Sequence, residues 1–186
     1  MRQLTEEVKD LLSKITGLKY EVEKLPSSLD DPLWDVSLEY RTALVTPPYE
    51  AHEIILSVWG YSNKDIVLLP QMKNSLKSLA ETLDHTNVDS FLLGDRYEWK
   101  EAEKKLPNAV AFLRKMDELA DEINKRHGSG VELYLEQDDE EWWLQARFNS
   151  RKLGRKEILQ RVERNIKGLL EALKEYHRRI EALERL

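Results

Sequence analysis

Residues 131–149 of this 186-residue chain read VELYLEQDDEEWWLQARFN, in which apolar and polar side chains alternate on both sides of a short acidic run. Alternation at every second residue is typical of β-strands that bury one face. The acidic run near residues 138–140 interrupts the pattern and suits a turn. We therefore predict a β-hairpin whose buried face is formed by Val131, Leu133, Leu135, Trp142, Leu144, Ala146 and Phe148.

Residues 16–40 repeat the order of features found in this hairpin. In each case an amphipathic helix ends at glycine, an alternating strand follows, and an acidic loop leads to a strand that opens on tryptophan. The two helices are predicted over residues 4–17 and 107–128. Two origins remain open for this weak internal α-β-β repeat: duplication of one unit, or convergent patterning of unrelated segments.

The segment between the two units is harder to assign. Residues 52–69 read as two short strands around a turn, with a helix from near Tyr49 as the alternative for residues 50–60. A further helix is predicted to begin at Pro70. Pro107 either opens a new helix or kinks a longer one.

These elements together predict the α+β class. Adjacent strands separated by helices favour an antiparallel sheet that helices cover on one face. We expect one domain over residues 1–186, with helix, strands and helix in residues 1–95 and a helix and hairpin in residues 96–150. A long amphipathic helix of coiled-coil type follows at residues 155–186.

The terminal helix carries an apolar stripe with alternating steps of three and four residues, which is the pattern of a coiled-coil seam. Its first half is wide enough to pack on the chain's own sheet, whereas beyond Tyr176 the stripe narrows to that of a two-helix contact. The helix at 107–126, a second copy or a different protein would cover it, and we expect a homodimer. The predicted association seam is Leu159, Val162, Ile166, Leu169, Leu173, Tyr176, Ile180 and Leu183.

Composition narrows the class of protein. The chain is 41% hydrophobic with five tryptophans, which is typical of a folded domain. It lacks cysteine, so disulfides and cysteine chemistry are excluded. We find neither a signal peptide nor an apolar run long enough for a membrane, and expect a cytoplasmic protein with no membrane contact. The 34% of charged residues hints at a thermophilic source.

The net charge of −6 is unevenly distributed. Residues 147–186 hold twelve basic and six acidic residues, against seventeen basic and twenty-nine acidic in the remainder. The basic residues either pair with the acidic body or bind phosphate, so a nucleic-acid-binding accessory protein is the alternative function. The residues for such an anion contact are Arg147, Arg151, Lys152, Arg155, Lys156 and Arg161.

No motif for catalysis, a cofactor or a metal is found in the sequence. Asp35 and Glu39 share one face of a strand, and a metal-dependent hydrolase built on them is the third and weakest hypothesis. Tyr134 and Trp143 are large aromatic residues on the sheet face where solvent is expected, so they are candidates for a protein contact. The leading hypothesis is therefore a non-enzymatic interaction, regulatory or adaptor protein.

Overall fold

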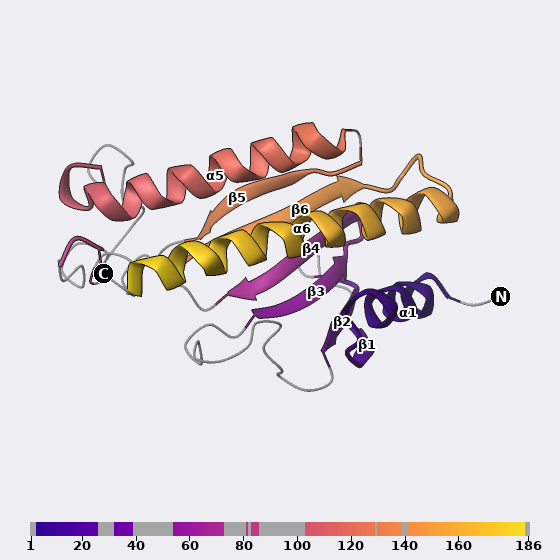
Figure 1. Cartoon of the computed structure of the whole chain (residues 1–186). Coiled ribbons are helices and arrows are strands. Elements are labelled where there is room, and N and C mark those ends of the chain that lie inside the picture. The colour runs from indigo at the N-terminus through magenta and orange to yellow at the C-terminus, as the bar shows by residue number, and fades with distance from the viewer. Residues whose placement is uncertain are drawn as a thin grey trace.

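The computed structural model describes residues 3–25, 32–38, 54–72, 81, 83–85, 103–128, 130–138 and 141–184. Within these ranges the chain forms one six-stranded antiparallel sheet together with long helices (Figure 1). The predicted α+β class and antiparallel sheet are confirmed. The strands are β1 (Tyr20–Lys24), β2 (Trp34–Leu38), β3 (Ile54–Gly60), β4 (Asp65–Met72), β5 (Leu133–Asp138) and β6 (Glu141–Asn149).

The three labelled helices are α1 (Leu4–Thr16), α5 (Pro107–His127) and α6 (Arg155–Glu184). Helix α1 ends because Gly17 adopts the left-handed conformation with φ of 75°, which glycine reaches without steric cost. Pro107 opens α5 in its first turn, where a missing N–H costs nothing, so the new-helix alternative is the one observed. The structure thus has the long terminal helix that the sequence predicts; its coiled-coil character is untested.

The sheet order is β1-β2-β3-β4-β6-β5. The two predicted helix–hairpin units therefore occupy opposite ends of one sheet. We call α1, β1 and β2 unit 1, and α5, β5 and β6 unit 2. Their first strands, β1 and β5, are the two edges of the sheet, and β3 and β4 lie between the units.

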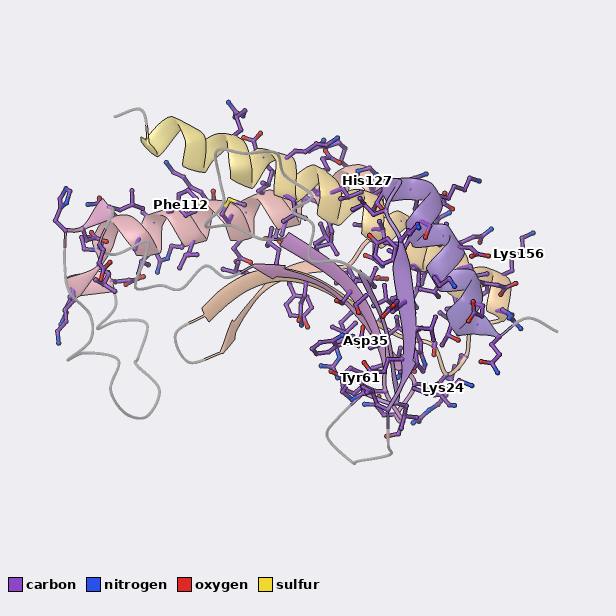
Figure 2. The ribbon with its side chains drawn as sticks, turned by 90° about the horizontal axis from the view of Figure 1, so that it is seen from below. Lys24, Asp35, Tyr61, Phe112, His127 and Lys156 are labelled. Atoms are coloured by element: carbon purple, nitrogen blue, oxygen red, sulfur yellow. The ribbon has the colours of Figure 1, made fainter. Side chains whose placement is uncertain are left out.

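All three helices lie on one face of the sheet, which buries the apolar side of every strand (Figure 2). Val8 and Leu12 of α1 are fully buried, as are Val36 of β2 and Leu68 of β4. Glycine at position 60 is required here, because a Cβ atom at Gly60 would overlap the indole of Trp34 on the neighbouring strand. The first hairpin is thereby packed closely against β3.

Part of the apolar stripe of α6 is covered by the chain itself. It lies antiparallel beside α5 (Figure 1), and Arg126 and His127 at the end of α5 both contact the carboxylate of Glu171. The His127 Nε2 to Glu171 Oε2 distance is 2.9 Å. The fully or nearly fully buried stripe residues of α6 are Val162, Ile166, Leu169 and Leu173, with Leu159 half-buried.

Two assignments in the middle of the chain are settled. Residues 54–60 form a strand, so the helix considered for residues 50–60 is absent from that range. The helix predicted to begin at Pro70 is wrong at its start, because β4 continues to Met72. Pro70 pairs with Leu56 of β3, whereas β6 pairs with β4 only from Asp65 to Leu68. Proline is tolerated there because, within the described residues, no strand pairs with this part of β4 on the β6 side, so no hydrogen bond from an N–H at this position is lost.

Candidate functional site: the outer face of the sheet

The face of the sheet away from the helices, here called the outer face, brings together polar residues from distant strands. Alternation along each strand places Glu21 and Glu23 of β1, Asp35 of β2 and Trp59 of β3 on this face. Arg147 of β6 and Tyr134 of β5 continue it toward the other end. In Figure 2, Asp35 and Tyr61 lie on the side of the sheet opposite α1 and α6.

The centre of the outer face is buried, although the sequence pattern predicts solvent on this face. Ser57, Val67 and Gln145 lie on it and are 1%, 4% and 5% exposed. Gln145 donates its side-chain amide to the hydroxyl of Tyr134, its cross-strand partner, so this polar pair is satisfied within the sheet. The exposed part of the outer face therefore lies toward its ends, with Glu21 and Glu23 at the β1 end.

Asp35 is the most perturbed group on the outer face. It lies directly across from Glu23 on one side and from Trp59 on the other. Burial disfavours the charged carboxylate, and the negative charge of Glu23 adds to the effect. Together they raise the pKa of Asp35 to about 6, although the nearby indole of Trp59 opposes the shift.

The contact between Asp35 and Trp59 is incomplete. The indole Nε1–H favours the charged carboxylate, yet within the described part of the chain neither it nor Oδ1 of Asp35 completes a hydrogen bond of normal geometry. Both atoms are buried, and buried polar atoms without a partner are costly. A donor or cation supplied from outside would relieve both this deficit and the repulsion from Glu23.

A second polar group on this face, centred on Asp65, is fully bonded. Its Oδ2 accepts from Nε of Arg147 at 3.0 Å and from Nη2 of the same guanidinium at 2.5 Å. Its Oδ1 accepts from Nδ2 of Asn149 at 2.8 Å, and Asn63 bonds its side chain and backbone. Burial opposes ionisation, but the bonds from Asn149 and Arg147 outweigh it and lower the pKa of Asp65. The group ties β4 to β6 and has the character of a structural anchor.

The predicted anion contact is divided by the structure. Arg147 pairs with Asp65, Arg155 pairs with Glu7 of α1, and Arg161 lies 3.6 Å from Glu132 and over the ring of Phe148. The other three residues of the set lie on the surface near the start of α6: Arg151, Lys152 and Lys156 are exposed. Half of the set is therefore engaged with the acidic body, which is the alternative that the charge distribution left open.

The structure describes the other predicted site residues only in part. Tyr134 is half-buried and bonded to Gln145, whereas Trp143 pairs with Glu136 in the ladder and its side chain lies outside the described residues. The side chains of the last seam residues, Tyr176, Ile180 and Leu183, also lie outside the described part. Glu39, the second residue of the proposed hydrolase pair, belongs to a range that the structure does not describe.

Two asparagines that the sequence analysis did not single out link the helices to the edge strand β5. The side-chain amide of Asn124 in α5 donates to the carbonyl of Leu133 at 2.7 Å and accepts from its N–H at 2.8 Å. Asn165 in α6 is completely buried and bonds the N–H and the carboxylate of Glu132 at 2.8 and 2.9 Å. Asn165 lies on the apolar side of the helix with Ile158 and Ala172. A polar residue at such a position is the sequence feature that could have identified Asn165 as a buried hydrogen-bonding residue.

Within the described ranges there is no group of three or more histidine, cysteine, aspartate or glutamate side chains placed to hold a metal ion. None of the described helices combines the length and apolarity needed to cross a membrane. Comparison with protein-family models, with curated proteins and with solved structures gave no match.

Proposed function

We propose that this chain is a non-enzymatic protein-binding module of the interaction, regulatory or adaptor type, and that its recognition surface is the β1–β2–β3 end of the outer face. The observation that carries the proposal is the Glu23–Asp35 pair. Two carboxylates face each other there, and one of them is half-buried with an oxygen that has no hydrogen-bond partner among the described residues. Such an arrangement destabilises the free chain and is relieved by a ligand that brings positive charge or donors.

The ion pairs of Arg147, Arg155 and Arg161 support protein binding over the nucleic-acid alternative. Arginines already paired with carboxylates are less able to release counterions from a nucleic acid. By contrast, the exposed glutamates of β1 would repel a phosphate backbone. A cationic segment of another protein suits this end of the sheet.

The first experiment compares capture of partners from native lysate by the wild-type chain and by two matched variants. Asp35→Asn removes the charge on the outer face, while Asp117→Asn removes one from the exposed side of α5. We expect Asp35→Asn to lose at least tenfold of the captured partner and Asp117→Asn to retain it. Recovery of the bait alone, or equal capture by both variants, would contradict the proposal.

We further propose that the chain self-associates through the last turns of α6. The support is the narrow heptad stripe at Tyr176, Ile180 and Leu183. Leu173 is unsuitable for testing this because it is 2% exposed within the chain's own core. We expect light scattering to give a dimer for the wild type and a folded monomer for Ile180→Asp with Leu183→Asp. A wild-type monomer at tens of micromolar would refute self-association and leave the outer-face proposal intact.

A further inference from the structure

The two edge strands of the sheet differ in what bonds the backbone groups that point away from the sheet. On β5, the amide of Asn124 bonds both the N–H and the carbonyl of Leu133. These groups are therefore unavailable to a further strand. On the other side of the sheet, β1 is the last strand in the order, and within the described residues nothing pairs with its outer side.

The outward groups of β1 follow from its pairing with β2. The N–H of Leu25 donates to the carbonyl of Leu33 at 2.8 Å, so Leu25 bonds toward β2. In an antiparallel ladder successive residues alternate, and hence Glu23 and Glu21 also bond toward β2. The backbone N–H and carbonyl groups of Tyr20, Val22 and Lys24 consequently point away from the sheet.

Alignment of the two units on their cap glycines shows why the outward groups of Leu133 on β5 are bonded by a side chain whereas those of Val22 on β1 are open. Asn124 lies four residues before Gly128, and Leu133 lies five residues after it. The equivalent positions in unit 1, counted from Gly17, are Ser13 and Val22. Val22 has outward-pointing groups, as Leu133 does, but the side chain of serine is too short to reproduce the paired bonds of asparagine. Unit 1 therefore keeps open the position that Asn124 occupies in unit 2.

The side chains beside this edge specify a ligand. Glu21 and Glu23 are exposed on the outer face, and Asp35 lies behind Glu23. On the helix side, Ile15 of α1 and Leu18 are partly buried apolar residues. A strand added to β1 would therefore place alternate side chains against carboxylates and against apolar surface.

From these observations we infer that β1 binds an extended basic peptide, which adds to the sheet as a seventh strand. Its outward-pointing partners are the backbone groups of Tyr20, Val22 and Lys24, and its lysine or arginine side chains lie opposite Glu21 and Glu23. The inference rests on the proposed function and names the chemistry of its partner.

A second copy of the chain fits this edge poorly. Antiparallel self-pairing centred on Val22 would set Glu21 of each copy against Glu23 of the other, and like charges directly opposite each other are destabilising. The acidic pattern therefore selects against self-pairing while it attracts a basic strand.

The test measures the affinity of the full chain for two acetylated, amidated and labelled peptides, Lys-Val-Lys-Val-Lys and Glu-Val-Glu-Val-Glu, by fluorescence polarisation at low salt. We expect the basic peptide to bind and the acidic one not to bind. Val22→Pro removes an outward N–H without touching the ladder to β2, and proline is tolerated at such a position. It should weaken binding at least tenfold, whereas Val22→Thr, which keeps the N–H, should stay within threefold of the wild type.

Two further variants address closure and charge. Ser13→Asn introduces the residue that closes β5 and should also weaken binding at least tenfold. Glu21→Lys with Glu23→Lys should abolish binding of the basic peptide and create binding of the acidic one. The matched control is Glu118→Lys with Glu122→Lys on the exposed side of α5, which changes net charge equally and should leave the preference unchanged. Circular dichroism checks that each variant is folded.

The possible results distinguish strand addition by a basic peptide from general charge attraction and from self-pairing. Equal binding of the basic peptide by the wild type, Val22→Pro and Ser13→Asn would mean general charge attraction and would overturn the inference. So would a concentration-dependent dimer that Val22→Pro dissolves, because a second copy would then occupy the edge. If no peptide binds but partner capture still depends on Asp35, the inference fails and the proposed function stands.

Discussion

Unit 1 and unit 2 share one architecture but differ in how completely their polar groups are satisfied. On the outer face, the cross-strand pair one step from Val22 and Val36 is Glu23 with Asp35, and the pair one step from Leu133 and Ala146 is Tyr134 with Gln145. The first pair is repulsive and raises the pKa of Asp35, because burial and the charge of Glu23 act together. The second pair is neutral and joined by a hydrogen bond.

The two edge strands, β1 and β5, also differ in whether their polar groups are bonded within the chain. Asn124 bonds the outward groups of Leu133 on β5, while Ser13 leaves the equivalent groups of Val22 on β1 open. Equivalent positions in two similar units thus carry groups that are bonded within the chain in unit 2 and groups that are open to a ligand in unit 1. The repulsive Glu23–Asp35 pair lies at the same end of the sheet as the open edge, which is the pattern expected of a binding end.

The largest effect is expected from removing the closure of unit 2. Asn124→Ala deletes two hydrogen bonds and leaves the N–H and carbonyl of Leu133 without partners. We expect it to lower the free energy of unfolding by about 2–3 kcal/mol. Ser13→Ala, at the equivalent position of unit 1, should change it by less than about 0.5 kcal/mol. Urea denaturation measures both, and equal losses in the two variants would show that the edges do not differ as described.

Substitution of Asp35 in the Glu23–Asp35 pair is expected to have a smaller effect on the free energy of unfolding, and of opposite sign. The pKa of Asp35 is raised in the folded state, so the folded chain binds more protons than the unfolded chain between pH 4 and 6. Stability contributed by the neutral carboxyl is therefore present at pH 4 and lost as the pH rises through about 6. Asp35→Asn keeps this site neutral at all pH values.

Asp35→Asn should accordingly raise the free energy of unfolding at pH 7 by about 1–2 kcal/mol, after allowance for solvent screening of a half-buried group. The gain should vanish below pH 4, where the wild-type carboxyl is also protonated. Thermal or urea unfolding across this range gives the measurement, with Asp117→Asn as the control. A gain that is independent of pH, or a loss at pH 7, would contradict the assigned ionisation.

Much of the fold follows from periodicity in the sequence. The two hairpins, the capping glycines and the start of the terminal helix all have local signals, because each depends on residues within a few positions. The helix predicted to begin at Pro70 was wrong for a non-local reason. Proline is tolerated in β4 because of where the pairing of β4 with β6 stops, and the local sequence does not show this. Sheet order likewise depends on contacts between segments about eighty residues apart, such as Asp65 with Asn149.

The candidate site was only partly accessible from sequence. The acidic outer face of the first hairpin was expected, but the position of Asp35 between Glu23 and Trp59 requires the register of three strands. Asn124 reads as an ordinary polar residue near the end of a helix until its bonds to Leu133 are seen. Its significance then depends on comparison with Ser13.

Helix α1 is synthesised before any strand, yet its packing depends on the end of the chain. Val8 and Leu12 are fully buried, α1 packs against α6, and Glu7 pairs with Arg155, a residue 148 positions later. During translation the apolar side of α1 must therefore remain without its final neighbour until α6 has left the ribosome. Contacts of such long range slow folding, and the side of α1 that faces α6 is expected to need shielding from aggregation until α6 is available.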